Sequence, residues 1–585
     1  MARMPRAHVG LAVLTGLAIA LAGCSKAPPA PGGTQGGQSG GAPSAASAPP
    51  VVAPPLASQA SAGQAAGPAG DLSTCPPRTP VLRVGGVFAS ENFSPHPMET
   101  RFSSTHYTRL YGTPLFGADP LETKVDPAYG AAESWEFSDD ATLLRVRLHD
   151  GLTYNNGEPI TAEDVAFSLE LAGSDFADPQ LTGIIRAFGA TAEAQNDREL
   201  LIHFKEGAVT FPTELSPLVY PFYVVPKKHH SNGAITQQAF DAFREQPVFA
   251  GPYEIVSREV QRSMILKAAR RDPLLGCPTY DRVEIYNIPE TGTRLAQFQT
   301  GQLDLAEGNR DLIEQAKGMG AKIASKPAAN IIGLYFFQTY SPTNILKDVR
   351  LRQAATYAID HQTLGKTIWL NEGIQSWGCT WPPPTEISME DPAYVAACGT
   401  PYPYDPDKAR QLLADAGYGP NNRPKIKLVF WGNYPEESDL AQAMQPMLNA
   451  VGFDTQIERV ERAEWERRRW IEGALDNSIM FFGPGGRATS LAGSYSVYGP
   501  NQGIGPKDDA DVVAALSRAA SANTEKEYVQ ATIDLGKLVH DRAYGPGFFA
   551  AGSIWFLRSN VPDWGLGQSK GRGPLNLSAL ATKRS

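Results

Sequence analysis

The chain of 585 residues carries 52 basic and 61 acidic side chains, a formal net charge of −9 at pH 7. A mildly acidic surface of mixed sign does not supply the positive charge that nucleic-acid phosphates attract, so we expect no nucleic-acid partner. The length and a hydrophobic content of 42% allow a large core and more than one domain.

The first residues are typical of an exported protein. Arg3 and Arg6 precede an apolar run at 9–22 that is too short to span a bilayer comfortably. The run ends in LAGC, which resembles the lipobox of bacterial lipoproteins. We therefore expect residues 1–23 to be a signal peptide and Cys24 to be lipidated, and an ordinary signal peptide with an incidental cysteine is the alternative.

Residues 24–70 predict a disordered tether. From residue 25 the segment consists almost entirely of Ala, Pro, Gly, Ser and Gln, with Lys26 as its single charge. Such a composition buries too little apolar surface to offset the entropy of ordering. As a flexible coil it spans roughly 35–40 Å on average.

Residues 129–170 predict a β-hairpin, a turn and a helix. Apolar and polar residues alternate over 135–148, which is the period of half-buried strands. Asn155-Asn156-Gly157 marks a turn, because Asn and Gly tolerate positive φ. Thr161 before two acidic residues is a typical helix N-cap.

The same segment, running from YGAAESWEFSDD to TAEDVAFSLE, resembles the hallmark segment of the family 5 extracellular solute-binding proteins. That family serves peptide, nickel and opine ABC importers. The resemblance covers residues 80–570 and includes further motifs in the family's order. These motifs are GPYEI at 251–255, TRLAQFQTGQLDL at 293–305, VRLRQAATYAID at 349–360 and YDPDKARQLL at 404–413.

The resemblance implies an α/β fold, namely the two-lobed periplasmic-binding-protein fold with mixed sheets. It also implies a hinge of two crossovers and an extra subdomain in the first lobe. We expect the first lobe at 71–310, with the subdomain at about 106–230, and the second lobe at 311–545. The C-terminal segment, 546–585, is expected to return to the first lobe.

Four cysteines besides Cys24 predict two disulfides in an exported protein. Cys379 and Cys398 are close in sequence and flank a Pro-rich loop, which favours their pairing, and Cys75–Cys277 is then the second pair. Structural zinc is the alternative, but no Cys-x₂-Cys or histidine spacing supports it.

Closure of two lobes would bury a solute between them. We expect ligand contacts from the loop after the first strand and from the strand–loop element 478–490. Trp431 and Tyr495 could stack on a planar solute, with packing in the protein as the alternative. The predicted ligand-binding residues are Phe88, Ser90, Glu91, Asn92, Trp431, Gly483, Gly485, Gly486, Arg487 and Tyr495.

The element at 478–490 departs from its relatives. Dipeptide-binding members carry an aspartate there that pairs with the peptide's amino terminus, whereas this chain reads Gly-Pro-Gly-Gly-Arg over 483–487. A guanidinium prefers carboxylate or phosphate partners. The hypothesis is a ligand that presents an anionic group to Arg487, and an ion pair within the protein is the alternative.

Metal binding is not expected. His229 and His230 are adjacent, so their side chains should point apart. The other histidines considered as nickel or haem ligands stand alone in the sequence: His96, His106 and His361.

The resemblance implies the substrate-binding component of an ABC importer, which delivers an oligopeptide-like, anionic-peptide or opine-type solute to an inner-membrane permease. We expect a monomer without a cofactor, lipid-anchored on the periplasmic side of a bacterial membrane. A periplasmic hydrolase and a ligand-presenting receptor or chaperone are the alternatives. The sequence GQSGG at 37–41 lacks the strand and helix that a hydrolase elbow needs, and the acidic pairs 436–437 and 508–509 are interpreted as solvated faces.

Overall fold

A computed structural model of the chain describes residues 72–88, 93–99, 107–119, 125–369, 374–376, 378, 392–431, 435–483, 505–562 and 577–583. All of them belong to one compact unit that extends from residue 64 to residue 585. Within these ranges, no helix has the length and apolar character needed to cross a membrane. The predicted signal peptide, Cys24 and the tether lie outside the described residues.

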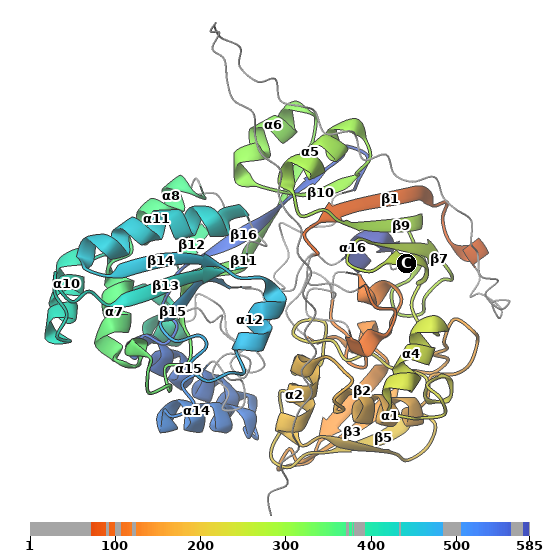
Figure 1. The fold of residues 1–585 in the computed structure, drawn as a ribbon. Helices are drawn as coiled ribbons and strands as arrows, with labels where there is room; N and C mark the ends of the chain where they lie inside the picture. Colours follow the sequence, from red (N-terminus) through yellow and green to blue (C-terminus); the bar gives the residue numbers. More distant parts are fainter. Residues whose placement is uncertain are drawn as a thin grey trace, which may run out of the picture. The chain divides into compact units, whose positions relative to one another are not determined.

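Eleven of the described strands form one mixed sheet (Figure 1). Their order is β14-β13-β15-β11-β16-β10-β1-β9-β7-β6, with β12 beside β16. The strands are β1 (Thr79–Gly86), β6 (Tyr253–Glu259), β7 (Ser263–Ala268), β9 (Tyr280–Asn287), β10 (Leu305–Gly308), β11 (Lys322–Phe336), β12 (Ile374–Ser376), β13 (Lys425–Phe430), β14 (Asp454–Arg459), β15 (Ser478–Gly483) and β16 (Gly547–Leu557).

The α-helices of the described residues flank this sheet and a smaller one. They are α1 (Ala162–Ala172), α2 (Pro179–Phe188), α3 (Phe211–Glu214), α4 (Gln237–Glu245), α5 (Thr291–Thr300), α6 (Ile313–Gly318), α7 (Val349–Tyr357), α8 (His361–Thr367), α9 (Pro392–Tyr394), α10 (Pro406–Asp415), α11 (Pro435–Val451), α12 (Arg462–Arg468), α14 (Ala510–Ala520), α15 (Glu525–Asp541) and α16 (Leu577–Ala581).

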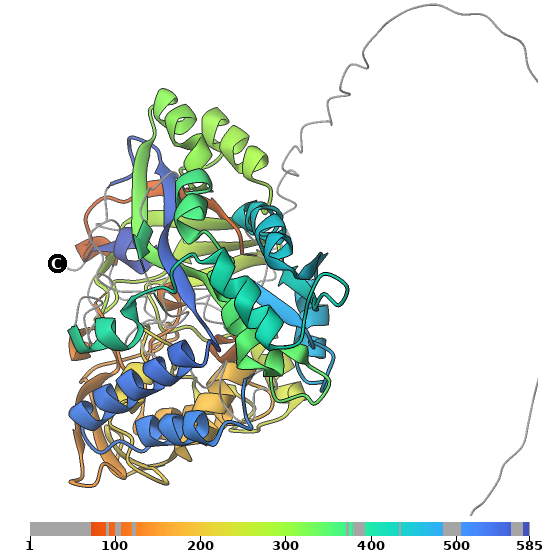
Figure 2. The ribbon, with the colours of Figure 1, turned by 90° about the vertical axis from the view of Figure 1, so that its left-hand side faces the viewer.

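Two long antiparallel strands, β11 and β16, connect the two lobes. Residues 322–326 of β11 pair with 553–557 of β16, which also pairs with β10 of the first lobe. Beyond a register shift after Lys326, β11 pairs with β15 of the second lobe. Figures 1 and 2 both show β11 and β16 side by side. Because each strand belongs to both lobes, the two strands are the crossovers of the predicted hinge.

The second lobe contains the parallel β13–α11–β14 crossover that the sequence predicts. Strand β13 also pairs in parallel with β15. Leu440, Met444 and Leu448 lie four residues apart on α11 and are buried in one cluster with Leu428 of β13. This spacing places them on one face of the helix. The apolar face of α11 therefore holds the helix against the sheet.

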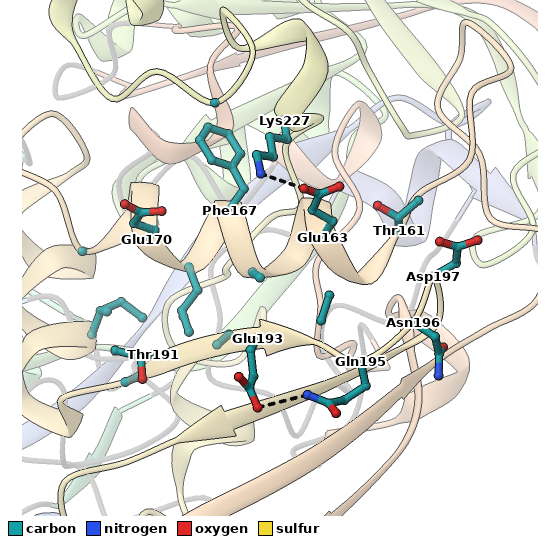
Figure 3. Close-up of a pocket in the computed structure, with 18 of the residues that line it drawn as sticks. Thr161, Glu163, Phe167, Glu170, Thr191, Glu193, Gln195, Asn196, Asp197 and Lys227 are labelled. Carbon is teal, nitrogen blue, oxygen red and sulfur yellow. Dashed lines mark hydrogen bonds and ion pairs between the residues drawn. The ribbon is translucent and has the colours of Figure 1, made fainter.

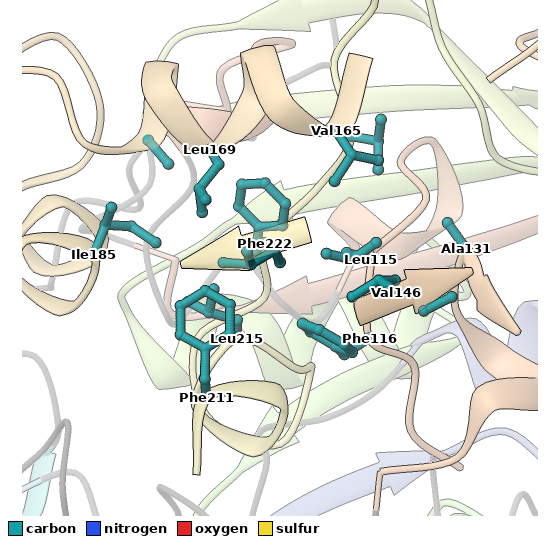
Figure 4. Close-up of a cluster of buried hydrophobic side chains, with 14 of the residues drawn as sticks. Leu115, Phe116, Ala131, Val146, Val165, Leu169, Ile185, Phe211, Leu215 and Phe222 are labelled. Carbon is teal, nitrogen blue, oxygen red and sulfur yellow. The ribbon is translucent and has the colours of Figure 1, made fainter. Parts of the chain in front are cut away.

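The first lobe contains a separate four-stranded antiparallel sheet in the order β2-β3-β5-β4. Its strands are β2 (Ala132–Phe137), β3 (Leu143–Leu148), β4 (Thr191–Ala194) and β5 (Glu199–His203). Helix α1 begins in a capping box: Thr161 Oγ1 accepts from Asp164 N at 3.2 Å, and Thr161 N donates to Asp164 Oδ2 at 3.0 Å. In Figure 4, Val165 and Leu169 point from α1 toward Phe222. All three are buried in one core cluster.

One predicted strand is wrong. Residues 222–225 make only an isolated bridge, between Tyr223 and Pro114. The Leu115 N–H donates to Phe222 O at 2.9 Å, but the return bond that a ladder needs is missing. The Phe222 N–H donates to Leu215 O at 3.1 Å, and the Leu115 carbonyl accepts from the Ala132 N–H at 2.9 Å.

Both ends of the described chain reach β8 (Cys277–Pro278). Strand β17 (Thr582–Lys583) pairs with β8, and Cys75 forms a disulfide with Cys277, as the sequence suggests. Cys398 is also disulfide-bonded, and Cys379, its predicted partner, lies outside the described residues.

Candidate functional site

The carboxyl ends of parallel strands are where open α/β sheets bind ligands. Strands β1 and β10 are parallel in the first lobe, and β13 and β15 are parallel in the second. Phe88 lies two residues after β1, Trp431 lies directly after β13, and Gly483 is the last residue of β15. The topology thus places three of the predicted residues at or just after the carboxyl ends of parallel strands.

Phe88 is buried in the first-lobe core. Its side chain is 2% exposed, and its ring centroid lies 6.3 Å from that of Phe93 and 6.4 Å from that of Tyr107. The Phe88 N–H donates to Asn287 Oδ1 at 2.8 Å, and the Val87 N–H donates to Glu307 Oε2 at 2.8 Å. These contacts fix the direction in which the chain leaves β1.

Trp431 belongs to an aromatic cluster at the end of β13. Its half-buried ring lies edge-on to Trp465, with 5.3 Å between centroids, and Phe337 contacts Trp465 at 5.7 Å. The Trp465 indole N–H is buried, and no residue of the described structure accepts a hydrogen bond from it. A buried donor of this kind calls for a partner, and a bound solute could supply it.

An ion pair joins the lobes next to the hinge. Arg310 follows β10, and its guanidinium lies 3.8 Å from Glu436 Oε1 at the start of α11. The Arg310 side chain is 4% exposed and that of Glu436 is 18% exposed. Arg310 also donates to Gly552 O of β16 and lies over the ring of Trp369, 5.8 Å from its centroid. One side chain therefore contacts the hinge strand and two second-lobe elements.

Two carboxyl groups near this ion pair are partly desolvated. Burial raises the pKa of Glu436, and the cation of Arg310 opposes this rise. Burial likewise raises the pKa of Glu307, against the cation of Arg294. The interpretation of 436–437 as a solvated face is therefore wrong, because Glu437 is also buried. An isolated acidic dipeptide carries no signal that it begins a helix packed on the other lobe.

The acidic pair at 508–509 is also less solvated than expected. Asp508 is exposed, but the Asp509 carboxylate is largely buried and forms an ion pair with Arg542. Asp509 also caps α14 and accepts from Tyr544 Oη at 2.9 Å. It has a structural role.

A groove of about 1240 Å³ lies elsewhere, between α1, α2 and β4 (Figure 3). Two pairs of its polar side chains bond to each other: Lys227 Nζ lies 2.7 Å from Glu163 Oε1, and Gln195 donates to Glu193 at 3.0 Å. The predicted ligand-binding residues are not among its lining residues. Since all its walls belong to one subdomain, hinge motion would not enclose a solute there.

Two adjacent histidines do point apart. His229 Nε2 lies 2.5 Å from Glu158 Oε2, whereas His230 Nε2 lies 3.1 Å from His96 Nε2. His96 is isolated only in sequence. No group of three or more His, Cys, Asp or Glu side chains that could hold a metal ion occurs within the described ranges. His106 lies outside them.

The remaining predicted ligand-binding residues lie outside the described residues: Ser90, Glu91, Asn92, Gly485, Gly486, Arg487 and Tyr495. Sequence reasoning missed Trp465, Arg310 and Glu436. The relevant sequence signals are weak, because a tryptophan in an Arg-rich helix and a single Arg or Glu occur in many surface segments.

Two curated relatives match most of the chain. Heme-binding protein A of Haemophilus influenzae is 25% identical over 464 residues, which are 74% of this chain and 80% of that protein. The glutathione-binding protein GsiB of Pectobacterium atrosepticum is 25% identical over 416 residues, 70% of this chain and 74% of that protein.

Solved structures share the fold. DppA from Helicobacter pylori, an ABC transporter-associated periplasmic binding protein in complex with the peptide STSA, has a TM-score of 0.70 at 19% identity. The similarity covers 85% of this chain and 97% of that one. NikZ from Campylobacter jejuni in complex with Ni(L-His) has a TM-score of 0.69 at 18% identity, over 83% and 95% of the two chains.

The sequence profile of the bacterial extracellular solute-binding proteins, family 5 Middle, matches residues 126–503. This range contains the hairpin–helix segment, most of the two-lobed fold, Arg310, Glu436 and the aromatic cluster at the end of β13. The chain belongs to family 5 of the bacterial extracellular solute-binding proteins.

Proposed function

We propose that this solute-binding protein is the substrate-binding component of an ABC importer, anchored by a lipid on Cys24 to the periplasmic side of a bacterial membrane. The family match over residues 126–503 carries the proposal. The signal-like residues 1–23 and the tether at 24–70 support it, because an acylated cysteine on a flexible segment leaves the folded part free to meet a permease. A monomer suffices for this role.

We keep the domain boundaries predicted from the sequence. We place the first lobe at 71–310, with its subdomain at about 106–230, the second lobe at 311–545 and the returning segment at 546–585. Strand β16 begins at Gly547 and pairs with β10 and β11, which supports the last boundary.

The proposed mechanism is capture by closure of the two lobes. Strands β11 and β16 bend as the lobes approach, and the strand ends after β1, β13 and β15 then enclose the solute. Trp431 supplies a flat apolar wall, and the buried Trp465 N–H is available as a donor. Glycines at 483, 485 and 486 would let backbone approach the solute closely.

The proposed ligand is a small peptide-like or opine-type solute with an anionic group. Relatives and structural neighbours are named for binding heme, glutathione, a peptide and a nickel–histidine complex. The sequence at 483–487 ends in Arg487 where dipeptide-binding relatives carry an aspartate, which favours an anionic group over a free ammonium at that place.

Replacing Arg487 by alanine is expected to weaken binding of glutathione, used as an anionic probe peptide, at least tenfold. The measurement is titration calorimetry on the full chain in a mild detergent. Arg410→Ala is the matched control, because Arg410 is an exposed second-lobe arginine that pairs with Asp407 on the same helix. Equal affinity of the Arg487 variant and the wild type would contradict the role of Arg487, and no binding by the wild type would contradict this ligand class.

We propose no catalytic activity, since the relatives and structural neighbours named above are binding proteins. A ligand-presenting receptor on the same scaffold is the second candidate. Loss of growth on a defined solute after deletion would favour transport. Product formation by the purified chain would favour the hydrolase.

A further inference from the structure

A buried pair of histidines ties together two segments of the first lobe. His96 precedes the short helix η2 (Pro97–Glu99), and His230 follows η6 (Lys227–His229). Their Nε2 atoms lie 3.1 Å apart, and both residues are 0% exposed. The pair is 134 residues apart in sequence. Segment 93–99 follows strand β1 in the chain, and its Phe93 packs on Phe88.

The hydrogen bonds of the pair assign both tautomers. His230 Nδ1 lies 2.8 Å from Ala234 O, a carbonyl that can only accept, so His230 Nδ1 carries a proton. His96 Nδ1 accepts from the Met98 N–H at 3.2 Å, so it carries none. The remaining bond then runs from His96 Nε2–H to the lone pair of His230 Nε2. Each ring is neutral, and all four ring nitrogens are used.

Proton uptake by either ring breaks one of these bonds. A proton on His230 Nε2 would face the proton of His96 Nε2 across 3.1 Å. A proton on His96 Nδ1 would face the Met98 N–H. The same hydrogen bonds disfavour a metal ion at the pair. A metal on both Nε2 atoms would require a proton on His96 Nδ1, which would face the Met98 N–H.

The surroundings of the pair are apolar and on balance oppose a positive charge. His96 stacks on Phe240 of α4, 4.3 Å between centroids, and Phe167 of α1 lies 5.4 Å from His230. The charged group of α4 that faces His96 is Arg244, which pairs with Glu99 of η2. Lys227 and Lys228 of η6 pair outward with Glu163 and Glu158. Burial lowers the pKa of both histidines, and Arg244 adds to this effect at His96.

We propose that the His96–His230 pair is an acid-sensitive clasp that holds segment 93–99 to the subdomain at neutral pH and releases it on acidification. Two neighbouring bonds also attach the segment: Arg244 Nε donates to Glu99 Oε2 at 2.8 Å, and Tyr111 Oη donates to Ser94 O at 3.0 Å. These bonds do not depend on a histidine proton. Release therefore loosens the segment at His96 first. The inference stands whether or not the proposed solute is correct.

The sign of the pH dependence follows from linkage. A histidine in an unfolded chain has a pKa near 6.5, and the folded pKa of each of these two is lower. Their contribution to stability is therefore complete above about pH 6.5 and falls as the pH drops below it. Each histidine that takes a proton only after release raises the opening constant up to about tenfold per pH unit.

The test compares the wild type with His96→Gln by urea unfolding of the full chain from pH 7.5 to 5. Glutamine can donate to His230 Nε2 but cannot be protonated. Below pH 6.5, the slope of the unfolding free energy against pH gives the number of protons taken up on unfolding. We expect this number to be smaller by about one in the variant than in the wild type. His203→Gln, an exposed histidine of β5, is the matched control and should keep the wild-type slope. An unchanged slope in His96→Gln would overturn the proposal.

A second measurement uses the wild type alone, so it does not depend on the folding of a variant. Long-range ¹⁵N–¹H spectra of histidine-labelled protein should show a neutral ring protonated on Nε2 for His96 and on Nδ1 for His230 at pH 6. Hydrogen exchange should also accelerate in segment 93–99 below that pH more than in β9. An imidazolium signal for either residue at pH 6 would overturn the proposal.

Discussion

Replacing Arg310 by methionine is expected to lower the free energy of unfolding by about 3 kcal/mol at pH 7. Methionine keeps much of the apolar stem but removes the cation that faces Glu436 across 3.8 Å. It also removes the hydrogen bond to Gly552 O and the contact over Trp369. A largely buried carboxylate then loses this counter-charge, which costs far more than the loss of an exposed ion pair. Urea unfolding monitored by circular dichroism measures the change.

Glu436→Gln is the matched control for Arg310→Met. Burial raises the pKa of Glu436 in the folded chain, so its contribution favours folding at low pH and is lost as the pH rises through the folded pKa. At pH 7 the neutral glutamine avoids that penalty but leaves the Arg310 cation, 4% exposed, without this counter-charge, so we expect a loss of stability smaller than that of Arg310→Met. The double variant should recover most of the stability lost in Arg310→Met. A larger loss in Glu436→Gln than in Arg310→Met would contradict this account.

Replacing both Cys75 and Cys277 by serine is expected to lower the free energy of unfolding by about 2–5 kcal/mol. The two cysteines are 202 residues apart, so the disulfide restricts a very long loop in the unfolded chain. The loss should also appear as early unfolding of β8 and β17, which hold the C-terminal residues to the first lobe. Urea unfolding combined with hydrogen exchange measures both effects.

The control for the disulfide is the wild type with a mild reductant. Cys398 is disulfide-bonded as well, so reduction removes more than one constraint, whereas the double serine variant isolates one. We expect reduction to cost at least as much as the double substitution. An unfolding midpoint in the double variant equal to that of the oxidised wild type would contradict the prediction.

Features set by neighbouring residues could be predicted from the sequence. Asp405 caps α10 by accepting from Lys408 N at 2.8 Å, and Pro406 is the first residue of that helix. Thr161 and Asp164 form the cap of α1. Each depends on residues at most three positions apart, whose preferences are strong and local. The family motifs could also be recognised in the sequence, and the prediction of the two-lobed fold rested on them.

Ion pairs and hydrogen bonds between side chains that are distant in the sequence could not be predicted, in contrast to the Cys75–Cys277 disulfide, which the cysteine count and spacing favoured. His96 and His230 meet across 134 residues, and Arg310 meets Glu436 only because β10 and α11 lie on either side of the hinge. Neither pair has a spacing that a local pattern could reveal. The strand predicted at 222–225 is wrong for a related reason. A ladder would join the Phe222 N–H to the Leu115 carbonyl, but these groups bond to Leu215 and Ala132.

Native mass spectrometry of the full chain in a mild detergent tests most directly whether the strand ends bind the solute. We expect the wild type to retain a small molecule of a few hundred daltons. Trp431→Ala should reduce its occupancy at least tenfold, whereas Glu193→Ala, in the groove between α1, α2 and β4, should leave it unchanged. Circular dichroism confirms that both variants are folded. Retention by Trp431→Ala together with loss in Glu193→Ala would contradict the account and assign the solute to the groove.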